Sequence, residues 1–129
     1  MANLSLLLVD DEKPLLALLR KYLERQGYTV DICETGQAAI TLCRREPCPF
    51  QLVVLDLKLP DMPGDAVLEV LLAGSPSLRV LISSGTPFSS ASLPEPLRHR
   101  VGSLLKPFMP KELLEAIEQL TPASRAAGA

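Results

Sequence analysis

Short apolar runs alternate with segments of helical periodicity along this chain. Continuous or alternating apolar residues predict strands at residues 4–9, 28–33, 50–55, 78–83 and 103–105. Apolar residues that recur three or four positions apart predict helices at residues 14–26, 38–43, 65–72 and 110–120. Strands separated by helices of this length are typical of right-handed crossovers in a parallel sheet with helices on both faces. The pattern therefore predicts an α/β fold.

Prolines and glycines mark where several of these elements begin and end. Pro14 and Pro110 suit the first turns of two helices, and Gly27 suits the C-terminal stop of the first helix. Between residues 85 and 101 the pattern weakens, because prolines interrupt a serine-rich stretch. We expect at most a short helix there, near residues 95–100.

Length and composition indicate one ordinary soluble domain. The chain has 129 residues, of which 47% are hydrophobic and 22% charged. We expect the domain to span residues 1–122, with a flexible C-terminal tail at residues 123–129. The net charge of −2 gives no excess of positive charge for binding nucleic acid. No apolar run approaches the roughly 18 residues that a membrane-spanning helix needs. The sequence therefore predicts a cytoplasmic protein that binds neither nucleic acid nor membranes.

The chain contains three cysteines, Cys33, Cys43 and Cys48. Their number is odd, and they lack the paired close spacing of a zinc site. We interpret them as small hydrophobic residues in a reducing compartment.

Polar and charged residues stand at the C-terminal ends of the predicted strands. These are Asp10, Asp11, Asp56, Ser84 and Lys106. Because such ends share one edge of an open parallel sheet, we expect these side chains to converge. Two carboxylates about 4 Å apart repel by about 4 kcal/mol at an effective dielectric of 20, which favours binding of a cation. Oxygen ligands without histidine or cysteine select Mg²⁺, with Mn²⁺ as the alternative.

Four motifs carry a family resemblance. The strings LLLVDDE, VVLDLKLPDMPG, VLISSG and LLKPF, in this order, closely resemble the response-regulator receiver domain of two-component phosphorelays. The resemblance spans about residues 4–120. It implies a doubly wound, flavodoxin-like fold with a five-stranded parallel sheet of strand order 2-1-3-4-5.

The resemblance also implies a role for each motif residue. Asp56 would be the phosphoryl acceptor, Asp11 the main metal ligand, Asp10 an auxiliary ligand through water, and Lys58 a ligand through its backbone carbonyl. Ser84 and Lys106 would contact the phosphoryl group, with the Lys106–Pro107 peptide cis. Four further residues would be structural near the site: Pro60, Gly64, Gly85 and Pro107. The donor would be a phosphohistidine on a histidine kinase or a histidine phosphotransfer protein, so the chain would be a signalling switch, not an enzyme with an external substrate.

Three departures from the family pattern qualify this interpretation. Ser103 stands where members often carry an aromatic residue that reports phosphorylation. Lys58 places a cation two residues beyond the acceptor, so the lifetime of the phosphate is expected to differ from that of typical members. The proline-broken segment 87–100 is expected to shorten the usual fourth helix and thereby to change the output surface that this helix forms.

Three other functions remain as alternatives. A pseudo-receiver would share the fold and serve only as a docking or dimerisation module. A flavodoxin-like electron carrier would need a hydroxyl- and glycine-rich loop where this chain has carboxylates. A magnesium phosphatase would need an acid at the position of Lys58. We expect a single-domain regulator, a phosphorelay intermediate or the receiver of a larger kinase, and the sequence leaves a homodimer open.

Overall fold

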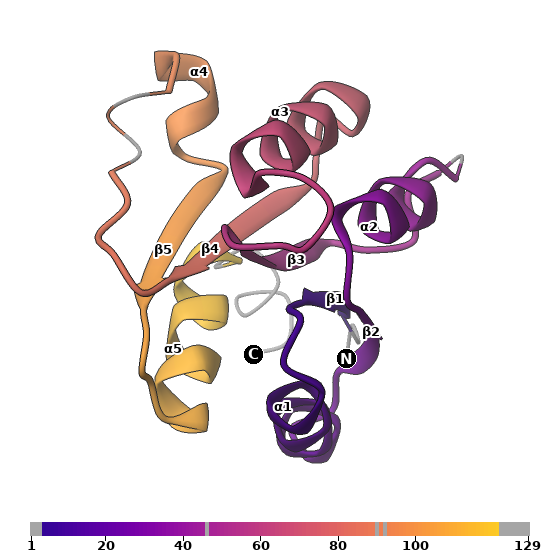
Figure 1. The fold of residues 1–129 in the computed structure, drawn as a ribbon, viewed down its shortest axis with the longest axis vertical. Coiled ribbons are helices and arrows are strands. Elements are labelled where there is room, and N and C mark those ends of the chain that lie inside the picture. The colour runs from indigo at the N-terminus through magenta and orange to yellow at the C-terminus, as the bar shows by residue number, and fades with distance from the viewer. Residues whose placement is uncertain (1–3, 46, 90, 92, 122–129) are drawn as a thin grey trace.

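The computed structural model describes residues 4–45, 47–89, 91 and 93–121, so the tail expected at residues 123–129 lies outside the described part. In this part, five strands form one parallel sheet in the order β2-β1-β3-β4-β5 (Figure 1). The strands are β1 (Ser5–Val9), β2 (Thr29–Cys33), β3 (Leu52–Asp56), β4 (Arg79–Ser84) and β5 (Val101–Leu105). The helices are α1 (Lys13–Arg25), α2 (Gly36–Cys43), α3 (Gly64–Gly74), α4 (Glu95–Arg98) and α5 (Pro110–Leu120). The predicted fold class and strand order are confirmed.

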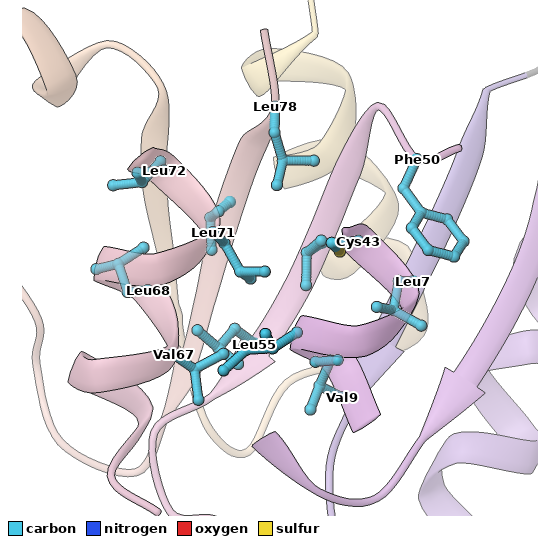
Figure 2. Close-up of a cluster of buried hydrophobic side chains, with 14 of the residues drawn as sticks. Leu7, Val9, Cys43, Phe50, Leu55, Val67, Leu68, Leu71, Leu72 and Leu78 are labelled. Carbon is cyan, nitrogen blue, oxygen red and sulfur yellow. The ribbon is translucent and has the colours of Figure 1, made fainter. Parts of the chain in front are cut away.

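The helices cover both faces of the sheet because consecutive strand residues point to opposite faces. Leu6 and Leu8 pack in one apolar cluster with α1 and α5. Leu7 and Val9 pack in a second cluster with α2 and α3. Figure 1 shows α1 and α5 on one side of the sheet and α2, α3 and α4 on the other, and Figure 2 shows the second cluster. The continuous apolar runs of β1 and β3 are therefore explained by burial on both faces.

The helix signals of the sequence agree with the structure. Pro14 lies in the first turn of α1, and Gly27 beyond its end has a φ of +100°, a conformation that glycine adopts without strain. Between β4 and β5, the α-helix formed by the described residues is the four-residue α4, as the prolines of this segment predicted. None of the helices in the described ranges is long and apolar enough to cross a membrane.

The strand boundaries differ from the predictions by one or two residues at several ends. The shift is two residues at two of these ends: β3 begins at Leu52 instead of residue 50, and β5 begins at Val101 instead of residue 103, because Val101 pairs with Val80 of β4. In addition, β4 includes Ser84, which pairs with Leu105. This pairing fixes the backbone of the predicted switch serine within the sheet.

Arg100, just before β5, is buried although it is charged. Its guanidinium donates hydrogen bonds to the backbone carbonyls of Leu72, Ser75 and Leu78, near the C-terminal end of α3. Cations near a helix C-terminus interact favourably with its unpaired carbonyls. Arg100 thus ties the end of α3 to the start of β5.

Candidate functional site

The parallel register brings the ends of the strands to one edge of the sheet. Val9 pairs with Leu55, so Asp10 follows β1 where Asp56 ends β3. Carboxylate oxygens of Asp10, Asp11 and Asp56 lie within 4.8 Å of one another. Asp10 and Asp56 are 6% and 5% exposed, whereas Asp11 faces solvent. The predicted convergence of these three carboxylates is therefore found in the structure.

Lys106, which follows β5, reaches into the same cluster. Its Nζ lies 2.8 Å from Asp10 Oδ2 and 3.4 Å from Asp56 Oδ2. Its backbone N–H donates to the carbonyl of Ser84 at 2.7 Å, and the Lys106–Pro107 peptide is cis, as the resemblance implied. Lys106 brings one positive charge to the cluster of three carboxylates, so negative charge remains for a cation to balance.

Burial and charge act in opposite directions on the two central groups. Burial raises the pKa of Asp56, while the N–H of Lys58 and the ammonium of Lys106 oppose this rise. Burial alone would lower the pKa of Lys106, but the hydrogen bond and charge of Asp10 and the charge of Asp56 raise it above its usual value. Lys106 is therefore a permanent cation at neutral pH, and it is shared between two acceptors.

The loop after β3 is shaped around Asp56. The N–H of Lys58 donates to Asp56 Oδ1 at 3.1 Å, so one oxygen of the acceptor candidate is held by the loop and the other faces Lys106. Gly64 lies so close to this turn that a Cβ would approach Leu57 Cα to 2.5 Å and the carbonyl oxygen of Asp56 to 3.0 Å. Only glycine fits there without a backbone shift. The side chains of Lys58 and Pro60 are exposed.

Asp61 in this loop connects the site to α2. Its two carboxylate oxygens each accept a backbone N–H at 2.9 Å, one from Gly36 and one from Gln37. These hydrogen bonds lower the pKa of Asp61, and the one from Gln37 has the largest effect. Asp61 therefore caps the N-terminus of α2 beside Thr35, whose hydroxyl accepts from Ala38 N. The sequence analysis assigned no role to Asp61.

The two serines at the end of β4 differ in their surroundings. The hydroxyl of Ser84 accepts from the N–H of Thr86 at 3.1 Å and lies 3.3 Å from the Thr86 hydroxyl, so it is occupied by its own loop. Ser83 pairs in register with Asp56, and its buried hydroxyl has no hydrogen-bond partner among the described residues. Gly85 is exposed, and a side chain at this position would extend into open space. The ring of Pro107 is also exposed.

Two contacts at the site were not predicted. Glu12 Oε1 lies 3.7 Å from Lys106 Nζ at the exposed rim, and Thr86 holds the Ser84 hydroxyl. The acidic triplet at residues 10–12 could have indicated that Glu12 lies near the site. The position of Thr86, two residues after Ser84, could have indicated its contact with Ser84, because serine and threonine hydroxyls often form hydrogen bonds within such turns.

The sequence and the fold of this chain are similar to those of known proteins. The model of the response regulator receiver domain matches residues 6–118. The transcriptional regulatory protein CssR of Bacillus subtilis is 32% identical over 119 residues, which are 90% of this chain and 50% of that protein. The aerobic respiration control sensor protein ArcB of Escherichia coli is 41% identical over 61 residues, covering 47% of this chain and 8% of that protein. The chain thus spans half or less of the length of these two relatives.

A solved receiver structure extends the comparison to the fold. The CheY-like response regulator receiver domain protein of Methanospirillum hungatei superposes with a TM-score of 0.80 at 27% identity. The match covers 97% of this chain and 99% of that one. The architecture of Figure 1 is therefore that of a receiver structure over nearly its whole length.

Proposed function

Because this chain belongs to the response regulator receiver domain family, we propose that it accepts a phosphoryl group on Asp56 from a phosphohistidine donor and thereby switches a protein-binding surface. The observation that carries this proposal is the cluster of Asp10, Asp11 and Asp56 within 4.8 Å, with Lys106 at 2.8 and 3.4 Å from two of its members. The donor would be a histidine kinase or a histidine phosphotransfer protein. The protein would act in the cytoplasm as a switch on its own aspartate, not on an external substrate.

The carboxylates fit a hard divalent cation, Mg²⁺ first and Mn²⁺ as the alternative. Asp10, Asp11 and Asp56 would hold it together with the backbone carbonyl of Lys58, and all of these donors are oxygen atoms. When bound, the cation would neutralise charge on the phosphoryl oxygens. The cluster has an exposed side at Asp11, which leaves access for a phosphoryl donor.

The chain's own residues would position and stabilise the transfer. Asp56 would attack phosphorus as a carboxylate, which is already a nucleophile and needs no general base. The N–H of Lys58 holds Asp56 Oδ1, and Lys106 would offset the charge of the transferred group. Positioning and charge neutralisation of this kind supply most of the catalysis in phosphoryl transfer.

Ser84 would convert the modification into a conformational change. Its hydroxyl now accepts from the Thr86 N–H and lies 3.3 Å from the Thr86 hydroxyl. A phosphoryl group on Asp56, as a stronger acceptor, would compete with the Thr86 hydroxyl for the Ser84 proton and turn the Ser84 side chain away from Thr86. Release of Thr86 would free the loop after β4, and the surface formed by β4, β5 and α5 would report the change. To shift the ratio of switched to unswitched molecules from 1:99 to 99:1, phosphorylation would have to stabilise the switched state by about 5.5 kcal/mol relative to the other.

The proposal is tested by phosphorylation with a small donor. Incubation with acetyl phosphate and Mg²⁺ should add one phosphoryl mass to the intact protein, and Asp56→Asn should abolish the addition. Asp31→Asn, an exposed carboxylate on β2, is the matched control and should be labelled like the parent protein. An unmodified mass in the presence of Mg²⁺ would favour the pseudo-receiver that only docks or dimerises.

A further inference from the structure

The loop between β3 and α3 carries two of the proposed cation ligands and folds back tightly on itself. Asp56 ends β3, and Lys58, with its backbone carbonyl, follows two residues later. The N–H of Gly64 donates to the carbonyl of Leu57 at 3.0 Å. Lys58 also pairs with Pro63 in an antiparallel bridge. The residues between Lys58 and Pro63 therefore form the tip of a short hairpin, and the position of the Lys58 backbone depends on where this tip is held.

The tip of this hairpin is fastened to the start of α2 (Figure 1). The carboxylate of Asp61 accepts the N–H groups of Gly36 and Gln37, one on each oxygen and each at 2.9 Å. Met62 packs at the same point, because a Cβ on Gly36 would come within 2.6 Å of Met62 Cγ and 2.7 Å of Val67 Cγ2. The lack of a side chain at Gly36 thus allows α2 to approach the loop closely enough for both hydrogen bonds to form.

The turn between β2 and α2 is also tied to the other segment that carries proposed ligands. The backbone N–H of Asp10, just after β1, donates to the carbonyl of Cys33 at 3.2 Å. Cys33 ends β2, three residues before the first N–H that Asp61 accepts. The short segment 33–37 therefore holds Asp10 at one end and the loop after Asp56 at the other, although the carboxylate cluster itself is formed by other residues.

We propose that Asp61 is a positioning residue for the cation: by holding the tip of its loop on α2, it places Asp56 and the Lys58 carbonyl at the correct distance from Asp10. The inference rests on the proposed function, because it assumes that the acidic cluster holds a divalent cation. Asp61 would not bind the cation itself, since both of its carboxylate oxygens accept amides of α2. Replacing a residue that orients the ligands of a metal typically weakens metal binding by about 10- to 100-fold.

A second explanation must be separated from positioning, because Asp61 also contributes a negative charge to this side of the molecule. Asp61→Asn and Asp61→Ala remove the same charge. Asparagine keeps one oxygen that can accept an N–H of α2, whereas alanine keeps no acceptor. Positioning therefore predicts a larger loss of cation affinity in Asp61→Ala than in Asp61→Asn, and charge alone predicts equal losses.

The experiment measures the affinity of the full chain for Mn²⁺ from the electron paramagnetic resonance signal of the free ion. We expect Asp61→Ala to weaken Mn²⁺ binding by about tenfold, and Asp61→Asn to weaken it less. Thr35→Ala is the matched control for the stability of α2, because the Thr35 hydroxyl accepts from Ala38 N at the same end of this helix. Asp65→Asn is the control for charge, because Asp65 is an exposed carboxylate in the first turn of α3. Both controls should bind Mn²⁺ as tightly as the parent protein.

Hydrogen exchange gives a second readout at α2 itself. Because coupling between two sites is reciprocal, a cation that binds more tightly when Asp61 holds α2 must in turn stabilise that contact. Saturating Mg²⁺ should therefore slow the exchange of the Gly36 and Gln37 amides in the parent protein, as measured by nuclear magnetic resonance. The same addition should slow these two amides much less in Asp61→Ala.

Several results would overturn the inference. Mn²⁺ binding that weakens in Thr35→Ala or Asp65→Asn as much as in Asp61→Ala would assign the effect to helix stability or to charge, and equal losses in Asp61→Asn and Asp61→Ala would also assign it to charge. Unchanged exchange of the α2 amides would show that no coupling exists. If Asp61→Ala binds Mn²⁺ as tightly as the parent protein, the inference fails while the proposed cation site stands. A parent protein that binds no Mn²⁺ would refute the cation site, and the inference with it.

Discussion

Replacement of Asp56 by asparagine is expected to stabilise the metal-free protein at neutral pH. At an effective dielectric of 20, the Asp56 carboxylate is attracted to the Lys106 ammonium at 3.4 Å by about 5 kcal/mol. It is repelled by Asp10, with oxygens up to 4.8 Å away, by about 3.5 kcal/mol. Exposed Asp11, screened by water, adds about 0.9 kcal/mol of repulsion at the dielectric of water. These contributions nearly cancel.

Burial of the carboxylate therefore decides the sign of the effect. Removing an ion from water costs several kcal/mol even after relaxation, and the raised pKa of Asp56 shows that this cost outweighs the net attraction. Asparagine keeps the shape and an acceptor for the Lys58 N–H but carries no charge. We expect the free energy of unfolding to rise by about 1 kcal/mol at pH 7.

The pH dependence gives an independent check of this reasoning. Because the pKa of Asp56 is higher in the folded than in the unfolded chain, its ionised form costs stability above the folded pKa. This cost is relieved as the pH falls and has vanished below the unfolded pKa of about 3.8. The stability difference between Asp56→Asn and the parent protein should therefore shrink as the solution is acidified.

Urea denaturation in the presence of a chelator, followed by circular dichroism, measures these differences. Asp31→Asn is the matched control, since this exposed carboxylate on β2 lies outside the cluster and should change stability little. Saturating Mg²⁺ at 100 times its Kd should stabilise the parent by about 2.7 kcal/mol and Asp56→Asn by less. An Asp56→Asn protein less stable than its parent at pH 7, or a difference that grows on acidification, would refute the reasoning.

Three further substitutions test other parts of the structure. Ser83→Ala should raise the free energy of unfolding by about 1 kcal/mol in the same urea assay, because the buried Ser83 hydroxyl has no hydrogen-bond partner among the described residues. A lower free energy of unfolding would show that the hydroxyl does have a hydrogen-bond partner. Arg100→Met should lower the free energy of unfolding by about 3 kcal/mol, because the carbonyls near the end of α3 lose the hydrogen bonds donated by the guanidinium. An unchanged urea midpoint would contradict the role of Arg100 in tying α3 to β5. Asp61→Asn should lower the melting temperature at pH 7, because the ionised Asp61 carboxylate stabilises α2 at any pH above the pKa of Asp61 in the unfolded chain. The difference in melting temperature from the parent protein should disappear as the pH falls through the lowered pKa of Asp61 in the folded chain. A difference that does not depend on pH would contradict the capping role.

The fold and the convergence of the site could be predicted because both depend on long, redundant patterns. The apolar runs of β1 and β3 are buried on both faces, so their hydrophobic signal is continuous. Once strands are parallel, their C-terminal ends share one edge, and Asp10 and Asp56 must lie near each other. The short helix α4 followed equally from the positions of its prolines.

The contacts of individual polar side chains could not be predicted in the same way. The Ser84 hydroxyl selects Thr86 through a local turn, and serine can adopt several rotamers at the end of a strand. Arg100 donates to three backbone carbonyls, and no residue type in the sequence marks a carbonyl as available.

The most direct test of the proposed cation site is the location of Mn²⁺ by anomalous diffraction from crystals soaked with the ion. The account predicts one strong peak between the carboxylates of Asp10, Asp11 and Asp56, and loss of that peak in Asp11→Asn. A peak remote from these three side chains, or none at saturating Mn²⁺, would contradict the proposal that they form a single divalent cation site beside the phosphoryl acceptor.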